Sequence, residues 1–134
     1  MTEFVLHPRL AADTAFIADW PLSRVLLMND ARFPWLILVP RRDGLSELHD
    51  LTSADAGVLT VEIRRAGAKL KELTDAAKIN TAALGNQVPQ LHIHVIARQA
   101  GDPAWPGPVW GHGAPTAYTP QAQGEFISRL RMGL

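Results

Sequence analysis

The sequence of 134 residues contains no cysteine. This absence excludes disulfide scaffolds, iron–sulfur clusters, cysteine-ligated zinc and thiol nucleophiles, so any nucleophile in this chain has to be another side chain. The absence also fits a cytoplasmic protein, which is the location we expect. A chain of this length is typical of one domain with a hydrophobic core of its own.

The chain also lacks net charge and long apolar segments. Its 13 Lys and Arg residues balance 13 Asp and Glu residues, which disfavours a protein whose main task is to hold nucleic acid, because neutralisation of phosphates supplies that affinity. The longest apolar runs, residues 25–28 and 35–39, are far shorter than the roughly 18 residues that a membrane span needs. The first residues show no basic segment followed by an apolar one. We therefore expect a soluble, unprocessed protein with no nucleic-acid or membrane partner.

Two apolar runs predict a pair of strands. Residues 25–28 and 35–39 are separated by a short polar turn that contains Pro34, which indicates an antiparallel pair. Neither run alternates with polar residues, so we expect both faces to be covered, for example by a helix on one side and a second subunit on the other. The structure type of residues 1–24 stays undecided.

The clearest predicted element is a helix over residues 53–74. Thr52 is placed to cap its first turn, and Asp55, three residues on, to complete a capping box. Charged residues such as Glu62 fall on other parts of the helix surface than the apolar stripe. The stripe repeats every three or four residues and consists of Leu59, Ile63, Ala66, Leu70 and Leu73.

The second half of the chain predicts two more strands, residues 78–84 and 91–98, joined by a link that Gly and Pro keep irregular. Residues 100–120 are rich in Gly and Pro but contain two Trp residues, which favours a segment folded over the domain instead of a disordered tail. Pro120 is a typical helix start. The fold class is therefore α+β, with an antiparallel sheet of about five strands, a long helix packed on it and an irregular C-terminal segment.

Residues 90–96 carry the one distinctive polar pattern. Gln90, His92 and His94 alternate with apolar residues. Because successive side chains of a strand point to opposite faces, these three polar groups are expected on one face and the apolar ones in a core.

Three interpretations of this pattern are open. It can be a solvated strand face that carries histidines by chance. It can be a metal site, which needs further ligands, although the other histidines are scattered and no carboxylate stands at a familiar spacing. It can be a catalytic site, because neutral imidazole attacks phosphorus near pH 7 when its second nitrogen is held by a hydrogen bond.

Residues 90–96 resemble the signature strand of the histidine triad (HIT) family, in which three histidines alternate with apolar residues. The order of the neighbouring segments is similar too, over about residues 20–106, and leaves 107–134 as a C-terminal extension with a short helix. The segments that carry the resemblance are a strand ending at Asn29, an apolar strand closing in Pro40-Arg41-Arg42, the long helix, a strand bearing Asn80, a loop with Asn86 and Gln87, the end of the triad strand at Arg98, and Trp105-Pro106.

This resemblance implies a single HIT-like domain over residues 1–134 that forms a homodimer by joining its sheets. It implies a nucleotide hydrolase or transferase that acts on nucleoside phosphoramidates, dinucleoside polyphosphates or related small-molecule nucleotidyl donors, without a metal or other cofactor. His92 would attack the α-phosphorus and form a covalent nucleotidyl-histidine, and His94 would assist the leaving group. Gln90 replaces the first histidine and is expected to change rate and pH profile. Asn29 would contact the ribose, and the phosphate site would contain Asn80, Asn86 and Gln87.

Two rival functions remain at this stage. One is a nucleotide-binding module without catalysis, in which Gln90 in place of the first histidine would indicate that the activity has been lost. The other is a metal-dependent hydrolase that uses His92 and His94 as ligands.

Overall fold

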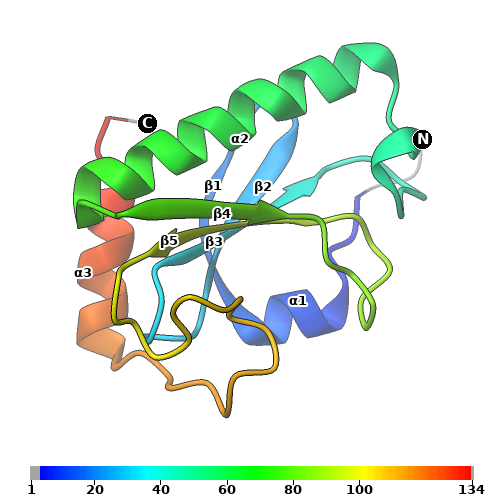
Figure 1. Ribbon diagram of the computed structural model, residues 1–134. Coiled ribbons are helices and arrows are strands. Elements are labelled where there is room, and N and C mark those ends of the chain that lie inside the picture. The colour runs from blue at the N-terminus through cyan, green and yellow to red at the C-terminus, as the bar shows by residue number, and fades with distance from the viewer. Residues whose placement is uncertain (1–3, 134) are drawn as a thin grey trace.

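The computed structural model describes residues 4–133 (Figure 1). Within these residues, one antiparallel sheet of five strands runs in the order β1-β2-β3-β5-β4, so the predicted α+β fold is confirmed. The elements in chain order are α1 (Pro8–Asp13), β1 (Thr14–Asp19), β2 (Ser23–Met28), β3 (Trp35–Pro40), the 3-10 turn η1 (Leu48–Asp50), α2 (Ser53–Thr74), β4 (Lys78–Ala82), β5 (Ile93–Arg98) and α3 (Pro120–Arg131).

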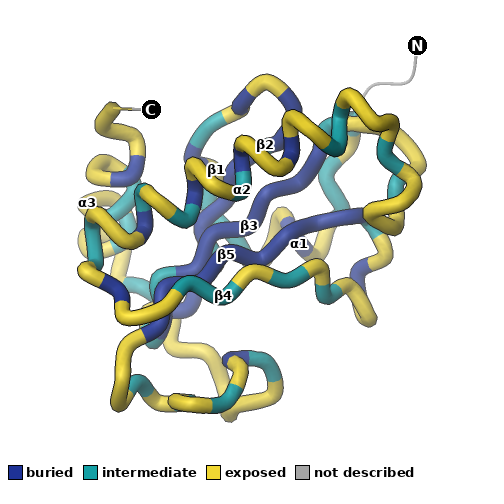
Figure 2. Tube along the Cα trace, turned by 45° about the horizontal axis from the view of Figure 1, so that its top comes forward, coloured by how far each residue is buried: buried dark blue, intermediate teal, exposed yellow. Residues whose placement is uncertain are grey.

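The middle of the sheet is buried on both faces, as the two apolar runs predict. Figure 2 shows β3 and β5 in the middle of the domain, and every residue of both strands is buried. One face packs against α2 and α3. The other face is covered by α1 and by the irregular segment around Val109 and Trp110, which belong to the same chain, so a second subunit is not needed for that cover.

The long helix α2 has the predicted bounds and the predicted N-cap. The Thr52 hydroxyl accepts a hydrogen bond from the backbone N–H of Asp55 at 3.1 Å. The expected capping box is not formed, because the Asp55 carboxylate instead accepts two hydrogen bonds from the Arg42 guanidinium, at 2.9 and 3.2 Å. An ion pair from outside the helix has replaced the local backbone bond.

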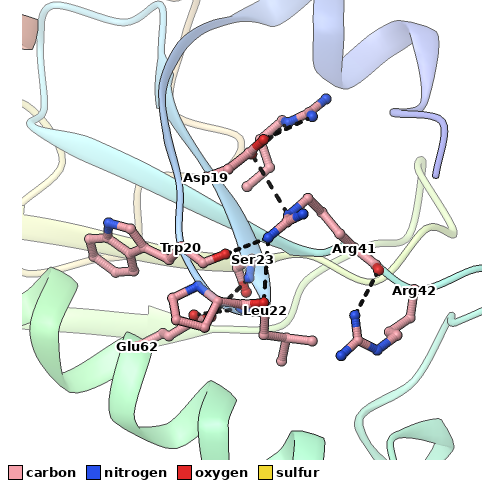
Figure 3. Close-up of polar contacts among 9 residues, drawn as sticks. Asp19, Trp20, Leu22, Ser23, Arg41, Arg42 and Glu62 are labelled. Carbon is pink, nitrogen blue, oxygen red and sulfur yellow. Dashed lines mark hydrogen bonds and ion pairs between the residues drawn. The ribbon is translucent and has the colours of Figure 1, made fainter. Parts of the chain in front are cut away.

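Glu62 lies outside the apolar stripe of α2 and is nevertheless buried. Its two carboxylate oxygens accept the backbone N–H groups of Leu22 (2.9 Å) and Ser23 (3.0 Å), where the turn after β1 leads into β2 (Figure 3). Close by, the Arg41 guanidinium donates to the carbonyl of Trp20. A buried carboxylate therefore attaches the β1–β2 turn to the long helix, where burial without such partners would be costly.

The chain between β5 and α3 is irregular but packed, as its Trp residues predict. Arg98, at the end of β5, is 1% exposed, and its guanidinium donates to both carboxylate oxygens of Asp102 at 2.7 and 2.9 Å. This ion pair lowers the pKa of Asp102 to about 2. It fixes the start of the segment that leads to Trp110. Within residues 4–133, we find no helix with the length and apolar character of a membrane span.

Candidate active site

His92 lies in the link between β4 and β5, just before β5 begins, and is 5% exposed. Its Nδ1 is 2.7 Å from the backbone carbonyl oxygen of Gln90. Because a carbonyl can only accept, Nδ1 carries the proton and Nε2 has the free lone pair. No hydrogen-bond partner for Nε2 is found in residues 4–133. This is the tautomer that a nucleophilic imidazole requires.

His94 lies within β5, and both of its ring nitrogens already have protein partners. Nε2 donates to the carbonyl oxygen of Leu84 at 3.0 Å, and Nδ1 accepts the indole N–H of Trp35 at 3.0 Å. These two bonds fix the neutral ring, since protonation of Nδ1 would place two donors face to face. Burial, reinforced by the neighbouring His92, lowers the pKa of His94 to about 4.

His94 is therefore a neutral, fully bonded ring, and in this arrangement neither nitrogen is free to assist a leaving group. What it does contact is the other imidazole: the two ring centroids are 4.9 Å apart, with an interplanar angle of 69°. The ring of Trp110 also packs against His94, with the ring centroids 5.1 Å apart. Through this packing, the ring of His94 supports the ring of His92.

Gln90 turns its side chain away from the two imidazoles toward the N-terminal segment. Its amide oxygen accepts the backbone N–H of His7 at 2.8 Å, and its amide nitrogen donates to the carbonyl of Val5 at 2.9 Å. The expectation that Gln90 joins the catalytic row by its side chain does not match this geometry. Only its backbone carbonyl reaches His92.

His92 lines two cavities. One, of about 340 Å³, is also lined by His94, Trp35 and Trp110, and shares its aromatic wall with a neighbouring cavity of about 630 Å³. The other, of about 290 Å³, is lined by His92 and by Glu47. A substrate that reaches His92 can therefore extend into either cavity.

Three of the four expected substrate-binding residues line these cavities. Asn86 and Gln87 line the cavity beside His92 and His94, and Asn29 lines the larger neighbouring one. The side-chain oxygen of Asn29 accepts the backbone N–H of Tyr118 at 2.9 Å, which leaves its NH2 group for other partners. Asn80 is placed elsewhere: its side-chain oxygen accepts a hydrogen bond from Arg98 at 2.8 Å, and it lines none of these cavities.

Sequence reasoning missed several residues of the site. Trp35 belongs to an apolar run that gave no sign of a polar role, and Arg9 and Asp13 come from the short helix α1. Gly85 carried a usable signal, because a glycine next to a catalytic loop often marks a close approach of the backbone. A Cβ atom at this position would lie 2.7 Å from the carbonyl oxygen of Val88 and 3.4 Å from Cε1 of His92.

A metal centre finds little support in this geometry. In the part of the chain that the structure describes, no group of three or more His, Asp or Glu side chains is arranged to hold a metal ion. His92 and His94 thus have no third ligand of this kind there, and both ring nitrogens of His94 are engaged by Leu84 and Trp35.

Comparison with known proteins points to one family. The sequence model of the HIT domain matches residues 9–101. A histidine triad protein from Bradyrhizobium japonicum superposes with a TM-score of 0.95 at 51% identity, over 97% of each chain. A HIT protein from Sinorhizobium meliloti 1021 superposes with a TM-score of 0.95 at 47% identity, over 98% of this chain and 97% of that one.

One curated protein with a named activity is more distantly similar. The bifunctional bis(5'-adenosyl)-triphosphatase/adenylylsulfatase FHIT of Arabidopsis thaliana is 29% identical over 87 residues, which is 61% of this chain. The match spans 48% of the length of that relative, so about half of the relative has no counterpart in the match.

Proposed function

Because this chain belongs to the HIT domain family, we propose that it is a nucleotidyl hydrolase or transferase that uses His92 as its nucleophile. The observation that carries the proposal is the fixed tautomer of His92, whose Nδ1–H is held by the Gln90 carbonyl while Nε2 has no protein partner in the described residues. The Arabidopsis relative is a bis(5'-adenosyl)-triphosphatase and adenylylsulfatase, which supports nucleotide hydrolysis as the reaction class.

The reaction has two balanced steps. In the first, the Nε2 lone pair attacks the α-phosphorus, the new P–N bond forms, and the bond from phosphorus to the leaving group breaks with its electron pair on the leaving atom, which takes a proton from solvent. In the second, water attacks the same phosphorus and forms a P–O bond, the P–N bond breaks with its electron pair returning to Nε2, the proton that the water loses passes to solvent, and a nucleoside monophosphate leaves. The ring carries positive charge in between, and the Nδ1–H bond to the Gln90 carbonyl stabilises that cation.

The two cavities suggest how a donor lies. The nucleoside occupies the side with Trp35 and Trp110, where aromatic rings offer apolar surface and Asn29 offers its NH2 group to the ribose. Asn86 and Gln87 meet the phosphate, whose developing negative charge amides can stabilise. The leaving group occupies the cavity beside Glu47. Nucleoside phosphoramidates, dinucleoside polyphosphates and adenylylsulfate are the donors to test.

His94 acts as a positioning residue in this scheme. Its ring packs on that of His92 while Trp35 and Leu84 hold both of its nitrogens, so it fixes the direction of the nucleophile and stays neutral above pH 5. A change of His94 to Gln should lower kcat and leave the shape of the kcat/KM profile above pH 5 unchanged, because a ring that stays neutral in this range does not titrate there. If His94 were instead the acid that protonates the leaving group, its replacement by Gln would remove one limb of the pH profile.

The covalent step can be tested directly. The protein is mixed with each donor in EDTA, quenched, digested and searched by mass spectrometry for a nucleotide adduct on the peptide with His92. We expect an adduct on native protein and none on His92→Ala, with His49→Ala as the matched control, because His49 is exposed and lines none of the three cavities. Turnover that stops in EDTA and returns with a divalent ion would favour a metal mechanism. Donor binding without adduct or product would favour a sensor.

We also propose that the protein is a homodimer whose sheets join, in the cytoplasm. Strand β4 is at one edge of the sheet, where its outer backbone groups lack a strand partner in the described chain. Such an edge is a template for pairing with a second copy. Val61 of α2, 60% exposed, supports an apolar contact on that helix. Light scattering after size exclusion should give twice the mass of one chain, and a single-chain mass would refute this proposal.

A further inference from the structure

The side chain of Gln90 makes two hydrogen bonds that match the pattern of a parallel strand pair. Its oxygen accepts from the N–H of His7 and its nitrogen donates to the C=O of Val5, so the two partners flank Leu6. In a parallel ladder, one residue bonds in this way to the residues before and after its neighbour. The Gln90 amide therefore holds the segment of residues 5–7 as a strand would.

The held segment leads directly into one wall of the site. Helix α1 begins at Pro8, immediately after His7, and the ring Nδ1 of His7 accepts the backbone N–H of Arg9 at 3.1 Å. Arg9 and Asp13 of this helix line the cavity beside His92 and His94. Loss of the bonds to Gln90 would free the start of α1 and with it this wall.

The same residue fixes the nucleophile from the other side, since its backbone carbonyl holds Nδ1 of His92 at 2.7 Å. We propose that Gln90 is a positioning residue that couples the N-terminal segment and the α1 wall to the orientation of His92. This proposal rests on the function proposed above for His92. It also gives the replacement of histidine by glutamine a physical role, because a primary amide presents a donor and an acceptor side by side.

Two substitutions separate the contributions of the two bonds. Gln90→Glu has the same shape and can still accept from His7, but its carboxylate faces the carbonyl of Val5 without a proton to donate. Gln90→Met has a similar length and makes neither bond. The matched control is Gln99→Met, because the Gln99 amide also bonds a backbone carbonyl, that of Thr74 at 3.0 Å, and lies outside the cavities.

The first measurement needs no substrate. Amide hydrogen exchange followed by NMR on the full chain should show the protection of His7 and of α1 falling roughly tenfold in Gln90→Met, a loss in keeping with one or two hydrogen bonds of typical strength. Gln90→Glu should show a smaller loss, and the amides of β3 and β5 should be unchanged in both. Unchanged protection at His7 in Gln90→Met would overturn the proposal that the Gln90 side chain holds the N-terminal segment.

The second measurement is turnover of whichever donor the native protein cleaves. We expect kcat/KM to fall by roughly tenfold in Gln90→Met, with KM rising as the α1 wall loosens and kcat falling as His92 is held less well, while Gln99→Met is unchanged. If the amides of His7 and α1 lose protection in Gln90→Met while KM and kcat stay native, the proposed link to catalysis is refuted. If native protein cleaves no donor, the proposed function fails. The exchange experiment still tests whether the Gln90 side chain holds the N-terminal segment.

Discussion

The neutral ring of His94 makes a quantitative prediction about stability in mild acid. A free histidine has a pKa near 6.5, and burial between Trp35 and Leu84 lowers that of His94 to about 4. The unfolded chain therefore binds a proton at this residue between pH 6.5 and 4, while the folded protein does not. Because stability falls wherever the unfolded state binds more protons, the free energy of unfolding should fall as pH is lowered through this window and level off below about 4.

The size of the effect follows from the same two values. The difference between 6.5 and about 4 corresponds to roughly 3 kcal/mol, which is a large part of the stability of a typical domain. The carboxylates with lowered pKa act in a different range. The pKa of Asp102, for example, is lowered to about 2 by its ion pair with Arg98, so its contribution is present above pH 3.8 and is lost only below that value.

Urea unfolding at pH 7.0, 6.0, 5.0 and 4.5 measures this slope. The matched variant is His94→Gln, whose amide can accept from Trp35 and donate to Leu84 but cannot titrate. The native protein should lose about 2 kcal/mol more than the variant between pH 7 and 4.5, and the other histidines cancel in the comparison. Parallel slopes for the two proteins, or an NMR titration of His94 with a midpoint near 6.5, would refute the argument.

Four further substitutions test other parts of the geometry. Gly85→Ala should abolish most adduct formation at His92, because its Cβ would lie 2.7 Å from the carbonyl of Val88 and force the loop to move; a native rate of adduct formation would show that the loop tolerates the change. Asn86→Ala should raise KM for the donor by roughly tenfold, because Asn86 lines the cavity beside His92. Asn80→Ala should leave KM unchanged and lower the free energy of unfolding by about 1 kcal/mol, because Asn80 bonds Arg98 outside the cavities. A raised KM in Asn80→Ala with a native KM in Asn86→Ala would show that Asn80, and not Asn86, binds the donor. Glu62→Gln should lower the free energy of unfolding by about 2 kcal/mol at unchanged kcat, since one of its two backbone donors then faces an NH2 group; urea denaturation and turnover check the two halves of this statement.

The parts of the fold that follow local patterns could be predicted from the sequence. Helix α2 was placed at residues 53–74 by one apolar stripe and one capping residue, and both are local features of the chain. The alternation at residues 90–96 correctly assigned Leu91, Ile93 and Val95 to the core under α2. The opening residues were harder, because a six-residue helix followed at once by a six-residue strand leaves too little periodicity to distinguish the two.

Polar side chains whose partners are far along the chain are beyond the reach of local patterns. Glu62 lies outside the apolar stripe of α2, and its partners Leu22 and Ser23 are about 40 positions away. The side-chain oxygen of Asn80, a residue expected at the phosphate site, bonds Arg98, 18 positions away. Periodicity predicts which face of an element a side chain occupies. The hydrogen-bond partner that the side chain meets on that face depends on how other elements pack.

The two histidines show the same limit within one strand pattern. Alternation correctly put His92 and His94 on one face, and equal placement suggested related chemical roles. Their surroundings differ: Trp35 from β3 and Leu84 from the link before β5 bond both nitrogens of His94, whereas within residues 4–133 the ring of His92 bonds the Gln90 carbonyl alone and Nε2 stays free. An imidazole can attack only through a ring nitrogen whose lone pair is free, and a hydrogen bond from its other nitrogen fixes which nitrogen that is. The count of protein partners on each ring, which no sequence pattern provides, is therefore what selects His92 over His94 as the nucleophile to test.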